Sequence, residues 1–495
     1  MNEKFFERWG ATIVATLLFL IYILGISNLS TIDGWGYAAD IVNSSNLLRP
    51  HHLLYTITGF YWVKIWHVFL PNAETIYLLK LMNTLCASVS AFILFKLLRL
   101  VKVDAIQATI YTIIAGLSWG FLRFSIENET YTIPVMLAIW ASYLFLKAEN
   151  SAKTSNMVYS GLLSASACLY HQIMFFWWIA LAIGTIRKLN SRDYKPLLFL
   201  APAAIVPAAY ILAMLSMGIE INFTSFFRFI FSDYYTGNAS IELNSTILMV
   251  GIINLFRTFF QMHGYINYLL AHSWLWWIPL VVSGIAFAFF SFWFVRYTKP
   301  TRLEKFHKIH LLALVLQVGF AFMAGGNAEF MAMVPFLTII TATGLTIKRN
   351  ATVWFAISVS VWNISFGVLP QKIYQADGSE LVIKSITQNT NERRAYILTD
   401  APKVINRLEY LQIQKPLIVK EVSIEPQKLY VTLDSLQLKG YTIYTDCINQ
   451  PRVTSRATLI TDVSLEWDNL EGYKTTTIDS LEMLGGKVYL TKISR

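Results

Sequence analysis

The chain has 495 residues, of which 55% are hydrophobic and only 14% are charged, whereas a soluble domain carries roughly 25% charged residues. This composition excludes a disordered chain, and three cysteines exclude a disulfide framework. The apolar excess predicts contact with lipid, and the formal net charge of +10, most of which lies in the apolar part, requires no nucleic-acid partner.

The composition changes near residue 370. Residues 1–370 contain 39 charged side chains and residues 371–495 contain 31, so the charged fraction rises from about 10% to about 25%. We therefore expect a polytopic α-helical membrane domain over 1–370, followed by a small soluble α/β domain over 371–495.

Eleven apolar runs predict transmembrane helices, and the cores of these runs are free of charged residues. The first run follows the charged start of the chain and is not followed by a clear cleavage site of small residues, so we interpret it as a retained signal-anchor helix. The predicted spans lie near 11–29, 76–98, 105–122, 131–147, 156–170, 172–187, 196–217, 274–296, 309–324, 330–347 and 351–369.

The basic residues between these runs predict the orientation. With the N-terminus inside the cell, 18 Lys and Arg of the membrane part fall on the cytoplasmic side and 6 on the other, as the positive-inside rule requires. Two further apolar stretches, 51–70 and 245–270, would spoil this bias if either crossed alone. We expect them to be interfacial helices on the outer face, with a re-entrant loop as the alternative for the second, and we expect 371–495 to lie outside a cell membrane as well.

An acidic and aromatic pair follows the first span. Asp33 and Tyr37 are four residues apart and share a face if a helix begins here. A carboxylate at the lipid boundary, beside Trp35, is expected to be partly desolvated, which would raise its pKa and make it a better base toward a hydroxyl group. The alternative is that Asp33 merely caps an interfacial helix.

A basic cluster opens the first interfacial stretch. Arg49, His51 and His52 lie at the start of the expected helix, a place that suits a phosphate. Ordinary interfacial histidines and an arginine extending to the membrane surface are the alternative.

Three later turns on the same outer side also carry polar groups. Arg123, Glu127, Glu129 and Tyr131 lie between the third and fourth spans, where the two carboxylates could bind sugar hydroxyls or a divalent cation, unless this is only a solvated turn. His171 lies in the tight turn after the fifth span, where a polar cap is the alternative. Glu329 opens the tenth span, where a lone carboxylate needs a partner or simply complements the helix dipole. Because only basic residues determine the predicted orientation, the location of these acidic and histidine residues on one side of the membrane is an independent observation.

The soluble tail shows alternating strand and helix signals. Residues 396–399 read as a strand, Asp400 as the cap of a helix that has Pro402 in its first turn and runs to about Leu411, and 416–420 as the next strand. The tail contains no glycine-rich nucleotide motif. We expect it to influence acceptor choice or stability and to be dispensable for chemistry.

Residues 1–370 resemble the GT-C glycosyltransferases, which take a sugar from a polyprenyl-phosphate carrier, and among them the protein O-mannosyltransferase-like enzymes and the aminoarabinose transferases that modify lipid A. The resemblance rests on Asp33 with Tyr37, Pro50-His51-His52-Leu53, Glu129-Thr130-Tyr131, Leu169-Tyr170-His171, and Glu329-Phe330 with Pro335. Phe330 stands where the family often has Arg-Tyr. No D-x-D is present on the outer face, so a metal is not implied.

The resemblance implies a membrane glycosyltransferase in which Asp33 acts as the base on an acceptor hydroxyl. The acceptor would belong to a glycan, a lipid or a protein, and no cofactor is expected. The residues expected to bind substrate are Tyr37, Arg49, His51, His52, Arg123, Glu129, Tyr131, His171, Arg257, His263 and Glu329. Among them Arg49, His51, His52, Arg123, Arg257 and His263 would face the leaving phosphate, and Glu129 and Glu329 would face sugar hydroxyls.

Two other functions fit a chain of this kind. A transporter or flippase of lipid-linked sugars would place ionisable groups or broken helices near the middle of the membrane, and the charge-free cores of the predicted spans argue against it. A membrane scaffold with a sensing domain would leave unexplained why acidic and histidine residues gather at the outer ends of several segments.

Overall fold

The computed structural model describes the chain except for residues 1–2, 152, 187–194, 238, 240, 242–243, 300, 389–392, 414–416, 424 and 449–469. The described chain forms two compact units. The first, here called the helical unit, comprises Met1–Ile26, Asn46–Gln261 and Ile278–Gly367. The second, here called the mixed unit, comprises Ser27–Ser45, Met262–Trp277 and Val368–Arg495.

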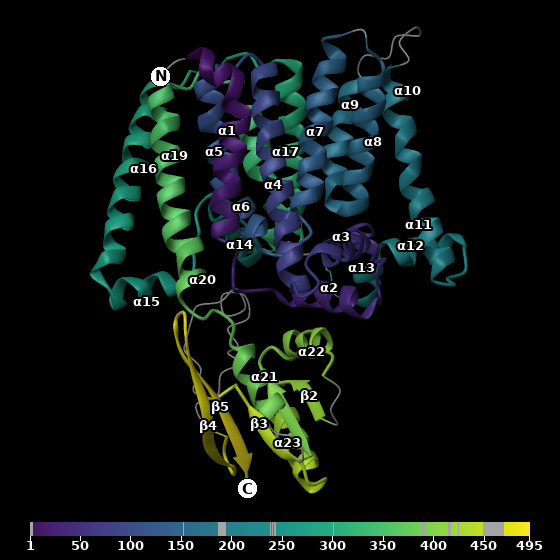
Figure 1. Ribbon diagram of the computed structural model, residues 1–495, viewed down its shortest axis with the longest axis vertical. Helices are drawn as coiled ribbons and strands as arrows, with labels where there is room; N and C mark the ends of the chain where they lie inside the picture. The colour runs from purple at the N-terminus through teal and green to yellow at the C-terminus, as the bar shows by residue number, and fades with distance from the viewer. Residues whose placement is uncertain are drawn as a thin grey trace. The chain divides into compact units, whose positions relative to one another are not determined.

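The helical unit consists of long helices that run side by side and shorter helices at one end (Figure 1). Its helices are α1 (Glu3–Leu24), α3 (Tyr55–Phe69), α4 (Thr75–Leu100), α5 (Ala105–Leu117), α6 (Trp119–Ile126), α7 (Thr132–Glu149), α8 (Ser155–Tyr170), α9 (Phe175–Ile186), α10 (Lys195–Leu200), α11 (Ile205–Ser216), α12 (Phe223–Ile230), α13 (Ser232–Thr236), α14 (Ser245–Phe259), α16 (Trp277–Tyr297), α17 (Lys305–Met323), α18 (Val334–Ala342) and α19 (Arg349–Asn363). Short 3₁₀ turns η1 (Pro50–His52), η2 (Gln172–Met174), η3 (Ala201–Ala204) and η5 (Glu329–Met331) and the π-helical segment η6 (Ile364–Val368) join them.

The chain is a multi-pass membrane protein. Seven of its described helical segments are long and apolar enough to cross a bilayer, and the bent pair α5 and α6 makes an eighth candidate. A helix lies at each of the eleven predicted spans, although α8, α9 and α18 fall short of a full crossing length. The predicted span 105–122 differs most, because the extended backbone of Ser118 breaks it into two helices bent by 67°.

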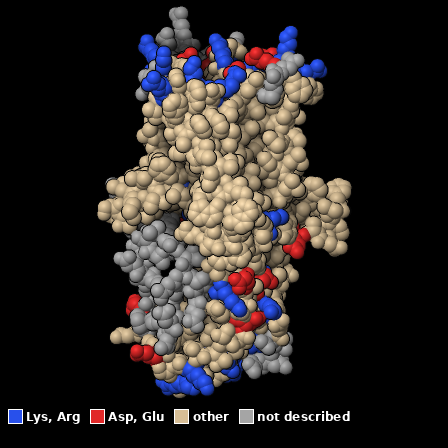
Figure 2. All heavy atoms as spheres, turned by 90° about the vertical axis from the view of Figure 1, so that its left-hand side faces the viewer, with Lys and Arg blue, Asp and Glu red and all other residues tan. Residues whose placement is uncertain are grey.

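Charged side chains gather at one end of the helical unit. Figure 2 shows Lys and Arg gathered at the end where the chain begins, above a wide belt of uncharged side chains on this face. The short helices α3, α6, α13 and α14 lie toward the opposite end of the unit (Figure 1). This separation agrees with the basic asymmetry read from the sequence.

Helix α4 supports the turn that follows α6. It is the most deeply packed of the seven unbroken candidate spans, with 72% of its most apolar segment buried. The side-chain amide of Asn83 on this helix donates to the carbonyl oxygens of Glu127 and Glu129 at 2.8 and 2.6 Å. The Thr84 hydroxyl donates to the Ser125 carbonyl at 2.9 Å. Because buried backbone carbonyls need partners, these bonds fix the position of the 127–129 turn.

The mixed unit contains a five-stranded sheet of order β2-β1-β3-β5-β4. Strands β1, β2 and β3 are parallel to one another, and β5 runs antiparallel to both of its neighbours, β3 and β4. Its elements are α2 (Ile32–Asn43), α15 (Tyr265–His272), η4 (Trp274–Trp276), α20 (Leu369–Ile373), α21 (Ser379–Gln388), β1 (Arg394–Leu398), α22 (Ala401–Tyr410), β2 (Leu417–Glu421), α23 (Pro426–Leu438), β3 (Thr442–Thr445), β4 (Lys474–Met483) and β5 (Gly486–Ser494). The predicted α/β character of the tail is confirmed.

Successive residues of β1 face two separate cores. Tyr396 and Leu398 pack with α21 and α22, whereas Ala395 and Ile397 pack with α23, as the two-residue period of a strand requires. The Asp400 side chain accepts a hydrogen bond from the backbone N–H of Lys403, so the predicted cap and strand–helix–strand order are correct. The predicted start of the second strand, Pro416, lies outside the described residues.

Candidate active site

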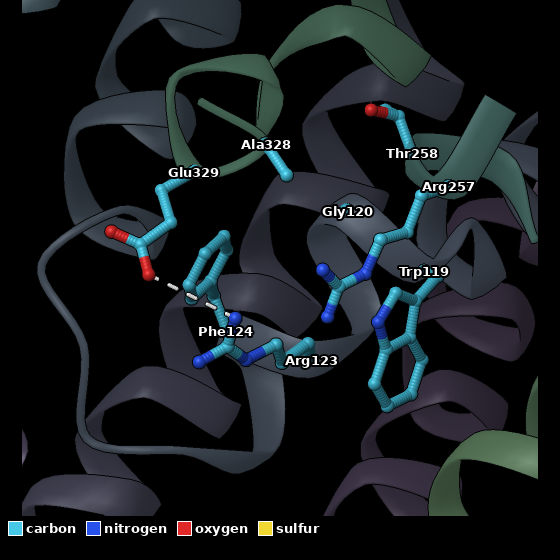
Figure 3. Close-up of a pocket in the computed structure, with 8 residues that line it drawn as sticks. All are labelled: Trp119, Gly120, Arg123, Phe124, Arg257, Thr258, Ala328 and Glu329. Atoms are coloured by element: carbon cyan, nitrogen blue, oxygen red, sulfur yellow. Dashed lines mark ion pairs between the residues drawn. The ribbon is translucent and has the colours of Figure 1, made fainter. Parts of the chain in front are cut away.

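A pocket that contains charged side chains lies in the helical unit between α6, α14 and the turn before α18. Figure 3 shows the guanidinium groups of Arg123 and Arg257 and the indole ring of Trp119 at this pocket, with Glu329 opposite. The lining residues are Trp119, Gly120, Arg123, Phe124, Arg257, Thr258, Ala328 and Glu329. Three predicted site residues from three distant parts of the sequence therefore meet here.

Arg123 is held by two carboxylates. Its Nε lies 3.1 Å from a carboxylate oxygen of Glu127, one helical turn later, and its Nη1 lies 3.8 Å from Glu329. Glu127 is fully buried, whereas the Glu329 side chain is about one-third exposed. The predicted need of Glu329 for a partner is met by Arg123, and two carboxylates fix the direction of one guanidinium.

Trp119 supplies a further hydrogen-bond donor at the pocket. Its ring is buried, and its indole N–H has no hydrogen-bond partner among the described residues. An unsatisfied buried donor costs roughly 1–3 kcal/mol. This N–H and the guanidinium groups of Arg123 and Arg257 can donate but cannot accept, so this side of the pocket suits an anion.

Tight packing places α14 against the other walls of the pocket. A Cβ on Gly120 would lie 2.8 Å from the Thr258 side chain, and one on Gly326 would lie 2.7 Å from the Gly251 backbone nitrogen. Gly326 also has a φ of +64°, which favours glycine. The Asn254 amide donates to the Gly326 carbonyl at 2.6 Å, so the Gly-Gly-Asn sequence before Glu329 fixes the approach of that turn to α14.

A histidine cluster lies in the same unit, around η1 and the turn between α8 and η2. The rings of His52 and His171 are 4.4 Å apart, and those of His51 and His52 are 5.5 Å apart. The Nε2 of His51 lies 3.0 Å from a carboxylate oxygen of Asp233. The Gln172 amide donates to Pro50 and Ile230 carbonyl oxygens at 3.3 and 2.9 Å, which ties these turns together.

Burial keeps two of these histidines uncharged. It lowers the pKa of His171 to about 3, and the nearby His51 lowers it further in the same direction. Burial is also the largest cause that lowers the pKa of His52; the neighbouring His171, His51 and Arg49 lower it further, and Asp233 opposes them. At neutral pH these rings can therefore form hydrogen bonds without adding charge.

Aromatic rings connect the histidine cluster with the pocket. The Tyr131 ring lies 4.8 Å from His171 and 4.4 Å from Phe124, and Phe124 lines the pocket. The predicted Glu129-Thr130-Tyr131 motif thus joins the two groups. The Glu129 carboxylate is also close enough to Tyr55 to raise the pKa of that phenol, after the larger effect of burial.

Nine of the twelve predicted site residues lie in the helical unit, and Asp33, Tyr37 and His263 lie in the mixed unit.

Thr31 caps α2 by accepting from the Gly34 N–H at 2.9 Å, so the interpretation of Asp33 as the cap is wrong. The Asp33 side chain is exposed, and the predicted burial beside Trp35 is not found in the protein itself. Tyr37 is buried, and His263 stacks on Tyr265 with ring centres 4.5 Å apart.

No protein-family model matches the sequence, and no curated protein matches it by sequence comparison. The structure is similar to that of ArnT from Cupriavidus metallidurans bound to undecaprenyl phosphate, with a TM-score of 0.50 and 10% sequence identity over 97% of each chain. The chain has a GT-C-like fold.

The expected resemblance is therefore confirmed at the level of the fold, and it covers most of the tail in addition to residues 1–370. Two further solved structures have lower TM-scores. The archaeal oligosaccharyltransferase AglB from Archaeoglobus fulgidus, in complex with an inhibitory peptide and a dolichol-phosphate, gives 0.43 at 11% identity over 89% of this chain and 70% of that chain. The mycobacterial arabinofuranosyltransferase AftD gives 0.45 at 13% identity over 98% and 41%.

Two residues of this site, Trp119 and Asp233, were not predicted from the sequence. Glu127 lies in the turn predicted to carry two carboxylates, but its pairing with Arg123 was not predicted, although an Arg and a Glu four residues apart share a helix face. Asp233 and Trp119 gave no such signal, since only the fold brings them to His51 and to Arg257. Within the described part of the chain, no three His, Cys, Asp or Glu side chains lie together as metal ligands would.

Proposed function

We propose that this chain is an integral-membrane glycosyltransferase that moves a sugar from a polyprenyl-phosphate donor to an acceptor hydroxyl. One observation carries the proposal: two arginines and an unsatisfied indole N–H meet in one pocket of a GT-C-like fold. ArnT, the protein of similar fold, was solved with undecaprenyl phosphate bound. A lipid-linked phosphosugar has the anion that such a pocket suits and a tail that the bilayer accommodates.

In this proposal the pocket binds the phosphate that leaves. The acceptor oxygen forms a bond to the anomeric carbon while the bond from that carbon to the phosphate oxygen breaks, so negative charge develops on the polyprenyl phosphate. Arg257 and Arg123 stabilise that charge, and Glu127 and Glu329 hold Arg123 in place before the donor arrives. Such preorganised donors usually contribute most where charge develops during the reaction.

The histidine cluster and the neighbouring carboxylates would hold the sugar and the acceptor. Neutral His52 and His171 suit hydroxyl groups, because each ring offers one donor and one acceptor. The Nε2 of His171 is buried and has no hydrogen-bond partner among the residues that the structure describes. Asp33 would remove the acceptor proton, and attack opposite to the leaving phosphate would invert the anomeric centre.

The proposal requires the phosphate pocket to face the outer side of a cell membrane. With the N-terminus in the cytoplasm, an odd number of crossings places the end of the chain outside. A reporter fused after Arg495 that is active only outside the cytoplasm should therefore be active. Cytoplasmic activity of that fusion would contradict both the predicted orientation and the outer location of the pocket.

The direct test of the function uses the purified full-length protein with a polyprenyl-phosphate sugar labelled in the sugar. We expect release of free polyprenyl phosphate and transfer of label to a hydroxyl acceptor or to water. A flippase would move the donor across vesicles and leave it intact, so donor translocation without cleavage would overturn the proposal. Profiles of cell-surface glycans with and without the gene would identify the acceptor class.

A further inference from the structure

Residues 371–495, which we call the soluble domain, contact α2, the helix that carries Asp33, at both ends of that helix. Helix α22 packs against α2, and both belong to the mixed unit. The Asn406 amide donates to the Ile32 carbonyl at 2.9 Å, near the start of α2. At the other end of the helix, the Asn43 amide donates to the Glu409 carbonyl at 3.1 Å. Hydrogen bonds at both ends limit sliding and rotation of α2 against α22.

Arg407 and Trp35 form the centre of this contact. The guanidinium carbon of Arg407 lies 4.9 Å from the centre of the Trp35 ring, and the Tyr410 ring lies 5.2 Å from the same tryptophan. Trp35 is only 8% exposed. A cation over a tryptophan face is attracted more strongly as water is excluded, and both the Trp35 ring and the Arg407 side chain are largely shielded from water here.

The other contacts of Arg407 anchor it to the start of the soluble domain. Its Nη1 donates to the Ser379 hydroxyl at 3.0 Å and lies 3.8 Å from the Asp377 carboxylate, and its Nη2 pairs with Glu380. Lys403, one turn earlier on α22, pairs with Asp377 at 3.0 Å. Arg407 thus contacts the N-terminal end of α21 and the Trp35 ring of α2 at once.

We infer that the soluble domain positions the proposed base: α22, through Arg407, fixes the orientation of α2 and with it that of Asp33. This inference rests on the proposed function and opposes the expectation that the tail is dispensable for chemistry. Arg407 is a positioning residue in this account, because it contacts Trp35, two residues from Asp33, and not the substrate. Asp33 itself is exposed in the first turn of α2, and the packing of α2 on α22 sets the position of its backbone.

The test combines kinetics and hydrogen exchange on the full-length protein. Arg407→Ala should lower kcat by about 10–100-fold, because small displacements of a reacting group are costly, while KM for the donor stays within about twofold. Amides of α2 should exchange faster in this variant. Arg407→Lys keeps the charge and loses the planar stacking group, so it should fall between wild type and Arg407→Ala.

Two further variants distinguish a loss of positioning from unfolding of the domain. Trp35→Leu removes the same contact from the α2 side, and β1 and β3 amides report whether the sheet remains folded. Lys384→Ala removes an exposed ion pair with Asp479 in the same domain and should behave as wild type. Normal kcat in both Arg407→Ala and Trp35→Leu, or unchanged exchange of α2, would overturn the inference. A wild-type protein without transfer activity would instead refute the proposed function, and the exchange of α2 would still report whether the soluble domain holds it.

Discussion

Replacing Arg257 with methionine is expected to lower kcat/KM for transfer from a polyprenyl-phosphate sugar by about 10²–10³-fold, the effect of removing one well-placed donor from a site of developing negative charge. Arg257 lies in the last turn of α14 and lines the same pocket as Arg123 and Trp119 (Figure 3). Methionine keeps an unbranched side chain of similar reach, so the packing of α14 should change little. Initial rates over a range of donor concentrations provide the measurement.

Arg228 offers a matched control for this substitution. It lies on α12, its side chain is exposed, and its guanidinium carbon is 5.6 Å from the centre of the Tyr235 ring, outside the pocket. Arg228→Met removes the same charge on the same predicted side of the membrane, so donor turnover should stay within about twofold of wild type. Equal losses in the two variants would show that the pocket does not bind the phosphate and that only the general positive charge of this face matters.

Much of the fold follows from patterns that act over short stretches of sequence. Apolar runs of membrane length identified a helix at each of the eleven predicted spans, because every backbone polar group in lipid must be paired within its own helix. The break at Ser118 was not visible in the same way. Serine is a small residue that also occurs in helices that cross membranes, and the extended conformation of Ser118 is visible only in the folded structure.

The charged residues of the candidate site could be predicted, because charges beside apolar runs are easily recognised in the sequence. Arg123, Arg257 and Glu329 stood out as charges next to apolar runs, and the structure brings all three to one pocket. Trp119 did not stand out, since a tryptophan at the end of a span is common in any membrane protein. Its importance comes from an unsatisfied N–H, which is a property of the packed structure.

The surroundings of Asp33 also combine local features, which the sequence indicates, with a long-range contact, which it does not. Asp33 and Tyr37 were expected to share a face if a helix begins there, and α2 begins at Ile32, one residue before Asp33. The cap is Thr31, because its hydroxyl reaches the Gly34 N–H. The partner of this helix, α22, lies more than 350 residues later in the chain, and no local pattern could have predicted that contact.

Asp33→Asn is expected to reduce transfer by about 10²–10⁴-fold, the usual contribution of a general base. Asparagine keeps the size of the side chain and cannot accept the acceptor proton. Since Thr31 caps α2, the substitution leaves the capping hydrogen bond in place. The exposed position of Asp33 also makes a loss of packing small, so expression and melting temperature should stay close to those of wild type.

The control is the other carboxylate of the same helix. Asp40 is only 5% exposed and accepts from the Ser45 hydroxyl at 3.4 Å, a bond that asparagine can also accept through its amide oxygen. Asp40→Asn should therefore retain most of the donor turnover. A collapse of activity in Asp40→Asn with a mild effect in Asp33→Asn would move the role of base to the buried carboxylate. Mild and equal effects in both variants would mean that neither carboxylate of α2 accepts the proton, and the base would then have to lie among the acidic groups of the helical unit, where Glu129 and Glu329 are the first residues to replace.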